Sequence, residues 1–219
     1  MTLDEYKAKI AEDESWTPGW LAIDSVFETL YPNQTPAHFG APMPSRALFG
    51  GDVFLDGISI YDSPNGYKHI VTYGMTELYA NEEYFGQEWS GWGYEMSFKL
   101  KAEDIAQCQW ALDMLNNLAR YTYQKERFFE PFQYLAGNGT SIQIGVESEI
   151  TGLLLIEDTQ AKGLDTPHGR VDFIQLVGIT THEVNAILEN KITPQELAEQ
   201  LQRNNPHMVT DMKRVYNAY

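Results

Sequence analysis

The first thirty residues place apolar side chains at helical spacing and predict two helices. Thr2 and Glu5 stand three residues apart, as in a capping box, and mark the start of the first helix. Thr17 followed by Pro18 supplies an N-cap and a first-turn proline for the second helix, which Pro32 ends. The apolar residues of the second helix share one face: Trp20, Ile23, Phe27 and Leu30. We expect that face to pack against another element.

Residues 32–56 show no sustained period and predict an irregular connection. They include Pro42, Pro44 and the pair Gly50-Gly51, all of which interrupt regular structure. A connection of this length inside a compact domain is often functional.

The segments that follow alternate between apolar and polar positions and predict a hairpin and a third strand. Ile58 and Ile60 belong to the first strand, residues 63–66 form a turn, and residues 67–72 return. In the third strand, residues 94–100, apolar side chains share one face and polar side chains the other. This alternation predicts a sheet with one dry face and one solvated face. The polar set is Glu95, Ser97 and Lys99.

A long helix and a second group of strands come next. Residues 103–124 place Cys108 and other apolar side chains on one stripe, which we expect to cover the dry face of the sheet. Alternation over residues 141–157 predicts further strands, and the apolar run at residues 171–179 predicts a central strand covered on both sides. Capping boxes predict two final helices: Thr180 with Glu183, and Thr193 with Glu196.

This order of elements favours the α+β class. We expect a mixed, mostly antiparallel β-sheet layered with helices. No internal repeat or linker divides the chain, so a single domain is predicted over residues 1–219. The weak periodicity of residues 204–219 predicts a partly mobile tail.

Charge and cysteine content narrow the classes of partner. The chain has 15 basic and 31 acidic residues, a net charge of −16, which disfavours nucleic acid and membranes as partners. The same charge attracts basic proteins. The alternative explanation is that the charge only keeps the protein soluble. The single Cys108 precludes an internal disulfide, and the first residues lack the features of a secretory signal. We therefore expect a cytoplasmic protein.

Motifs for metal binding or catalysis are missing from the sequence. The five histidines, at positions 38, 69, 168, 182 and 207, have no zinc-site spacing, and no phosphate-binding loop or nucleophile elbow occurs. We expect His69 to pack within a strand, His168 to lie exposed in a turn, and Cys108 to be buried. The turn at residues 164–170 is explained by Pro167 and Gly169. No metal, cofactor or enzymatic activity is predicted.

One catalytic alternative remains open. Asp56, Glu77 and Glu95 lie near predicted strands, and two carboxylates across a cleft can act as acid and base. Under this alternative, the chain is a carboxylate-dependent hydrolase, and it should have a deep pocket that holds two acids.

Two segments combine aromatic and acidic residues and suggest a binding surface. Residues 73–79 end in Glu77 and Tyr79, and residues 84–92 include Trp89 and Trp92. Aromatic side chains supply buried anchors in protein interfaces, and carboxylates select a basic partner. The alternative is that these rings fill the core.

Six stretches, in order, resemble the Suppressor of fused family and specifically its N-terminal domain. They span about residues 18–190. The stretches are residues 19–24 (GWLAID), 55–61 (LDGISIY), 71–79 (VTYGMTELY), 90–100 (SGWGYEMSFKL), 118–121 (LARY) and 165–178 (DTPHGRVDFIQLVG).

The resemblance implies a non-enzymatic α+β domain that binds protein. An animal member holds a zinc-finger transcription factor in the Hedgehog pathway, whereas stand-alone bacterial members are thought to be immunity proteins that neutralise toxins. We expect an intracellular immunity protein with a basic toxin as partner, and a regulator that sequesters a transcription factor as the alternative. The resemblance makes Tyr79 the first candidate contact. Further candidates are Glu77, Glu95, Trp89 and Trp92.

Overall fold

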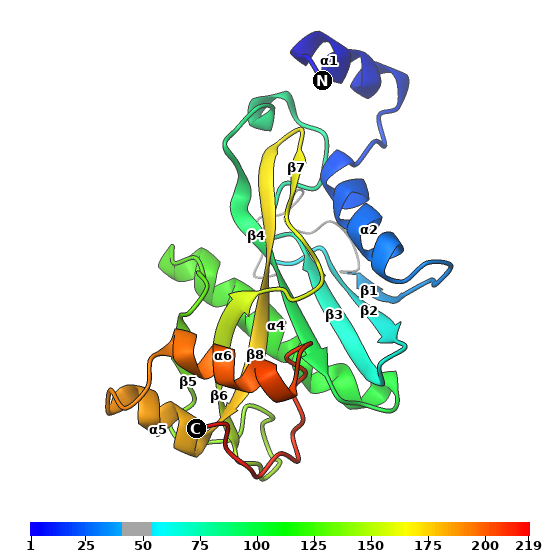
Figure 1. Cartoon of the computed structure of the whole chain (residues 1–219). Helices are drawn as coiled ribbons and strands as arrows, with labels where there is room; N and C mark the ends of the chain where they lie inside the picture. The colour runs from blue at the N-terminus through cyan, green and yellow to red at the C-terminus, as the bar shows by residue number, and fades with distance from the viewer. Residues whose placement is uncertain (41–53) are drawn as a thin grey trace.

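The computed structural model describes residues 1–40 and 54–219 and has an α+β architecture (Figure 1). The helices are α1 (Leu3–Glu12), α2 (Pro18–Leu30), α4 (Gln109–Lys125), α5 (Thr181–Leu188) and α6 (Pro194–Asn204), with short 3-10 helices η1 (Glu82–Tyr84) and η2 (Ile105–Cys108). The strands are β1 (Ala37–Gly40), β2 (Gly57–Ser63), β3 (Tyr67–Tyr73), β4 (Trp89–Leu100), β5 (Tyr134–Ala136), β6 (Ile150–Glu157), β7 (Leu164–Thr166) and β8 (Gly169–Thr180).

Within the described residues, the strands form one eight-stranded sheet in the order β1-β2-β3-β4-β8-β6-β5, with β7 paired to β8. The pair β4 and β8 is parallel, and the other pairs are antiparallel. The mixed, mostly antiparallel sheet is therefore confirmed. The predicted hairpin is confirmed as β2 and β3, and the predicted central strand as β8, which lies between β4 and β6.

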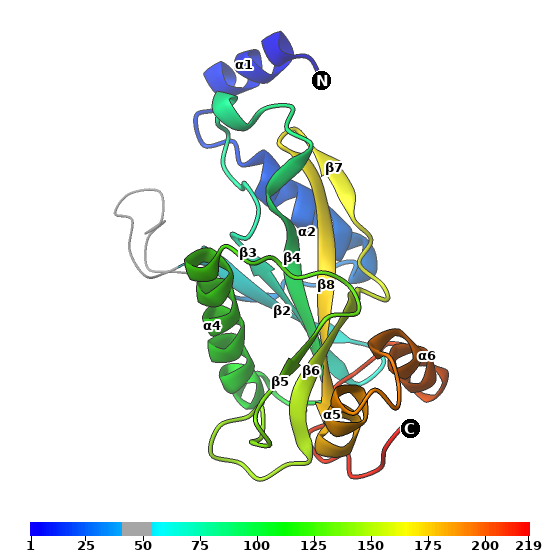
Figure 2. The same ribbon diagram turned by 90° about the vertical axis from the view of Figure 1, so that its left-hand side faces the viewer.

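Helices cover both faces of this sheet (Figure 2). Helix α4 packs on one face, where Met96, Phe98 and Leu176 meet Leu112 and Leu115. On the other face, α2 packs against β2, β3 and β8, and α5 and α6 pack against β6 and β8. Burial of apolar side chains in both layers holds the elements together.

The prediction of a solvated face on β4 is wrong. Glu95, Ser97 and Lys99 are each fully buried. Alternation along a strand identifies which side chains share a face, but it does not reveal what covers that face. Here the polar side chains of β4 point into the layer that holds α2 and the connection after β6.

These buried polar groups are satisfied by a connected network around Asp158. Its carboxylate accepts from Lys99 Nζ at 2.9 Å, from Ser97 Oγ at 2.5 Å and from His69 Nε2 at 3.0 Å. His69 Nδ1 lies 2.7 Å from the hydroxyl oxygen of Tyr31 at the end of α2. The network therefore ties the sheet to a helix, and His69 is buried as predicted.

Two segments differ from their predictions, one expected to be irregular and one expected to form strands. Residues 32–56 contain the short strand β1, which pairs with β2, while the prediction for Pro42, Pro44 and the Gly50-Gly51 pair lies outside the described residues. Residues 141–149 form no strand, and β6 begins at Ile150. The alternating Ile144 is 92% exposed, because this segment loops away from the sheet instead of pairing along it.

The helix ends agree more closely with the predictions made from the sequence. Capping boxes are present at Thr2, Thr180 and Thr193. Thr17 makes no side-chain capping bond, although Pro18 begins α2. Cys108 is buried as predicted.

The segment predicted as a partly mobile tail is attached to the body at several points. Arg214 is buried and pairs with Glu183 at 2.6 Å, and the backbone of Thr210 bridges to Leu100. The mobility of this tail stays a prediction. In the described part of the chain, every helix is too short or too polar to cross a membrane.

We predict that Lys99→Met lowers the free energy of unfolding by about 3 kcal/mol, because it leaves Asp158 buried without the ammonium group that pairs with it at 2.9 Å. The matched control is Lys101→Met, which breaks a pair with Asp211 whose lysine side chain is 65% exposed. An exposed pair contributes little. Urea unfolding measures both changes, and equal effects of the two substitutions would contradict the assignment.

Candidate functional site

The candidate site is built on the connection between β3 and β4, residues 74–88, which we call the β3–β4 loop. Glu95 lies beneath its first residues. Its carboxylate accepts from the backbone N–H groups of Gly74 at 3.0 Å, Met75 at 3.3 Å and Thr76 at 3.0 Å. The hydroxyls of Thr72 and Thr76 each donate to it at 2.7 Å. One buried side chain thus fixes the start of the loop.

Burial and hydrogen bonding act in opposite directions on Glu95. Removal from water raises the pKa of its carboxyl to about 7, against the hydrogen bonds from Thr72, Thr76 and Gly74, which favour the ionised form. Glu95 is fully buried, so the expectation that its side chain contacts a partner is corrected. Its role in the structure is to shape the loop.

Helix α2 holds the same loop from the other side. The backbone N–H of Gly19 donates to the carbonyl of Leu78 at 3.1 Å. A Cβ atom on Gly19 would lie 2.0 Å from the carbonyl oxygen of Glu77, so glycine is required for this close approach. Ser90 adds a further contact, since its hydroxyl accepts from the N–H of Glu77 at 3.0 Å.

The loop lines a pocket with a volume of about 370 Å³. Tyr79 and Tyr84 are 38% and 39% exposed at its edge. Burial, together with the nearby carboxylate of Asp56, raises the pKa of Tyr79. The lining also includes Glu77 and Asn81. The pocket therefore combines aromatic rings, carboxylates and backbone groups.

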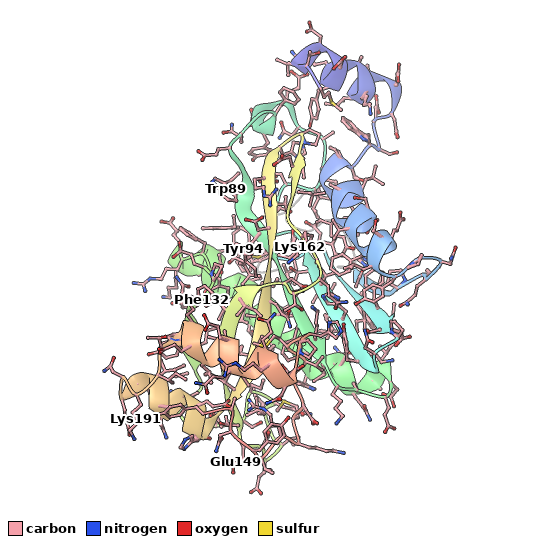
Figure 3. The ribbon with its side chains drawn as sticks, viewed as in Figure 1. Trp89, Tyr94, Phe132, Glu149, Lys162 and Lys191 are labelled. Atoms are coloured by element: carbon pink, nitrogen blue, oxygen red, sulfur yellow. The ribbon has the colours of Figure 1, made fainter. Side chains whose placement is uncertain are left out.

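The two predicted tryptophans occupy different environments. Trp89 is 48% exposed at the start of β4, in the upper part of the molecule (Figure 3). Trp92 is half-buried and meets the ring of Tyr123 edge-on at 5.3 Å. The structure brings Glu77 and Tyr79 together in the pocket, whereas neither tryptophan is part of its lining.

The three acids of the catalytic alternative are not equivalent. Asp56 and Glu77 line the pocket, but Glu95 lies below it with its oxygen atoms occupied by donors of the loop. Among the described residues, no group of three or more His, Cys, Asp or Glu side chains is arranged to hold a metal ion. The site presents side chains suited to binding a surface.

Sequence reasoning missed two residues that support this loop. His168 was expected to be exposed in its turn, but it is fully buried because Tyr6 of α1 packs over it. The contact spans 162 positions of sequence, so local pattern does not reveal it. The one available signal is that Tyr6 is an aromatic residue in an otherwise mostly polar helix.

The surface around the pocket is acidic. Residues 77–88 contain four glutamates and no lysine or arginine. Lys7 of α1 pairs with one of them, Glu82, at 2.9 Å, with both side chains about half exposed. An exposed pair of this kind is weak, and the local field remains negative.

Comparison with known proteins identifies the family. A family model described as Suppressor of fused protein (SUFU) matches residues 51–215. The chain belongs to the Suppressor of fused family. Suppressor of fused homologs of Homo sapiens and Mus musculus are each 31% identical over 213 residues, which cover 90% of this chain. The same alignment covers 43% of each relative, so the chain spans less than half of their length.

Solved structures of Suppressor of fused proteins share the fold. A chain of the Sufu-Fu complex crystal structure has a TM-score of 0.80 and 25% identity, covering 92% of this chain and 93% of that one. The crystal structure of Drosophila Suppressor of Fused has a TM-score of 0.78 and 24% sequence identity, and the match covers 93% of this chain and 52% of that one. The crystal structure of a SUFU homolog from Neisseria gonorrhoeae has a TM-score of 0.58 and 14% sequence identity, and the match covers 92% of this chain and 97% of that one. The resemblance expected from sequence is confirmed.

The raised pKa of Glu95 gives a pH-dependent prediction. The folded state binds the proton more tightly than the unfolded state, so the stability that Glu95 provides is present below about pH 4.5 and lost as pH rises through about 7. We expect this contribution to change by roughly 3 kcal/mol across that window. Glu95→Gln is also destabilising, because its amide N–H₂ meets donors of the loop.

The measurement is the difference in unfolding free energy between the natural protein and Glu95→Gln from pH 5 to pH 8. This difference is expected to shrink as pH rises. Glu88→Gln, at an exposed position, is the control and should change little across the range. A difference that grows with pH would show that the hydrogen bonds outweigh burial and that the assignment is wrong.

Proposed function

We propose that this chain is a non-enzymatic protein-binding domain that uses the acidic pocket of the β3–β4 loop. The observation that carries the proposal is the exposure of Tyr79 and Tyr84 on a loop that buried groups hold in place. Exposed tyrosines on a fixed backbone bind with a small loss of conformational entropy. Family membership supports the same conclusion.

The proposed partner is a basic protein, and the proposed role is that of an intracellular, cytoplasmic immunity protein that neutralises a toxin. The net charge of −16 and the run of glutamates at residues 77–88 support a basic partner. A related crystal structure contains a complex of Sufu with Fu, which supports protein binding by this fold. Sequestration of a transcription factor is the alternative role, and the Suppressor of fused relatives of animals favour it.

We place Tyr79 and Glu77 in direct contact with the partner, and Trp89 at the border of the interface. Glu95 acts by holding the loop, and Trp92 by packing beside Tyr123. The hydrolase alternative depends on Asp56 and Glu77 acting together in a pocket of about 370 Å³. Substitution of Asp56 by asparagine separates the two functions, because a hydrolase loses turnover whereas a binding domain retains its partner.

We predict that the double substitution Tyr79→Ala and Tyr84→Ala weakens partner binding at least about 30-fold, as expected for loss of aromatic anchors. The immobilised chain is used to capture partners from its host, and affinity is then measured with the purified partner. Tyr216→Ala is the control, since Tyr216 is 66% exposed and is not part of the pocket lining. Equal loss in the control, or retention in the double variant, would remove the pocket from the interface.

A basic partner also predicts a dependence on salt. The association rate should fall steeply as ionic strength rises, while the dissociation rate changes less. The toxin-neutralising role is tested by co-expression, in which the chain restores growth of cells that produce the captured partner. A captured partner that is harmless to cells would favour the regulatory alternative.

A further inference from the structure

Helix α1 is attached to the body of the protein largely through one side chain. It lies at one end of the molecule beside η1 (Figure 1). Of its ten residues, all of them described, Tyr6 is the one that is buried. The Tyr6 ring lies 4.8 Å from the ring of Phe85 and 5.2 Å from that of Trp16. Tyr6 belongs to none of the three apolar core clusters, so its ring packs outside the main core.

The hydroxyl of Tyr6 reaches the backbone of the β3–β4 loop. The N–H of Asn81 donates to this oxygen at 2.8 Å, and the carbonyl of Asn81 lies 3.3 Å away. Nε2 of His168 lies 2.7 Å from the same oxygen. Asn81 also lines the candidate pocket, so Tyr6 contacts the back of the surface that carries Tyr79.

His168 extends this contact to a second point of the loop. Its Nδ1 lies 2.9 Å from the carbonyl oxygen of Glu77. A neutral imidazole with its proton on Nδ1 satisfies both contacts, donating to Glu77 and accepting from the Tyr6 hydroxyl. Burial lowers the pKa of His168, which favours that neutral form. The chain of bonds runs from Tyr6 through His168 to Glu77.

The turn that carries His168 supports the far end of the loop. The carbonyl of Pro167 accepts from the N–H of Gly86 at 2.9 Å. Gly169 has a φ of +113°, and a Cβ atom there would lie 2.6 Å from the carbonyl oxygen of Gln87. The sequence accounts for this turn as a tight connection, but the structure shows that it also contacts the loop at three separate points: Glu77, Gly86 and Gln87.

We propose that Tyr6 is a positioning residue for the proposed binding surface, and that α1 fixes residues 77–86 through the Tyr6–His168–Glu77 bonds. This inference rests on the proposed function, because it assigns α1 the task of holding the loop in its binding conformation. The Tyr6 anchor, defined as Tyr6, Asn81, His168 and Glu77, holds a later part of the loop than Glu95, which contacts residues 74–76. Loss of the anchor leaves the sheet intact and releases the loop.

The test is hydrogen exchange of the full-length protein, followed by mass spectrometry. Tyr6→Phe keeps the ring between Phe85 and Trp16 but removes the hydroxyl, leaving Asn81 N–H and His168 Nε2 without this partner. We expect amide exchange at residues 77–86 to accelerate on the order of tenfold, as for loss of one net hydrogen bond. Exchange in β3 and β8 should stay unchanged. Tyr216→Phe, an exposed tyrosine, is the matched control.

Two results would overturn the proposal. Unchanged exchange at residues 77–86 in Tyr6→Phe would show that the hydroxyl does not hold the loop. A uniform increase across β3 and β8 would show that Tyr6 supports the whole fold. Tyr6→Ala provides a second variant, in which the local effect should be larger than in Tyr6→Phe.

The binding arm uses the partner captured by the natural protein. Tyr6→Phe should lower the affinity for that partner several-fold, although Tyr79 and Tyr84 are unchanged. An affinity equal to that of the natural protein would overturn the positioning role. If the natural protein retains no partner, the proposed function fails. The exchange experiment still decides whether α1 fixes the loop, so the two failures are distinguishable.

Discussion

Over most of its length the parallel pair β4 and β8 is covered by α4 on one face and by helices and connections on the other, so a polar side chain in the covered part must find a partner away from water. Burial of an unpaired charge costs several kcal/mol, and a partly satisfied network costs more than an apolar one. Within the described residues, each buried side-chain nitrogen and oxygen atom has a hydrogen-bond partner. The polar face of β4 therefore determines where neighbouring segments must lie.

The two ends of this polar face have different effects. Lys99 and Ser97 meet Asp158, which fixes the connection after β6 against the sheet and, through His69 and Tyr31, the end of α2. Glu95 meets the backbone of the β3–β4 loop instead. The same strand thus provides both a structural centre and the base of the candidate site. Loop geometry and core packing are consequently coupled through a single element.

Much of the fold follows from local patterns, and most of the candidate site does not. Side chains two residues apart on a strand share a face, so the alternation around Ile58 and Met96 identifies one face of the core. The continuous apolar run around Val177 identifies a strand that is covered on both faces. The exposed Ile144 shows the limit of that argument, since alternation also occurs where no neighbouring strand accepts the segment. Glu95 and His168 were misplaced for a related reason: the groups that bury them lie outside the local pattern. Thr76, which binds Glu95, is 19 positions away, and Tyr6, which contacts His168, is 162 positions away.

A binding surface made from a loop loses affinity if the loop must be ordered on association. The β3–β4 loop is already ordered by three sets of contacts: with Glu95, with Gly19 of α2 and with the turn that carries His168. Each contact uses backbone groups of the loop, so side chains such as Tyr79 stay available at the surface. If the loop binds as proposed, sequence change in the exposed side chains can alter the choice of partner without loss of the loop conformation. The proposed surface thus separates the residues that would select a partner from those that maintain the shape of the loop.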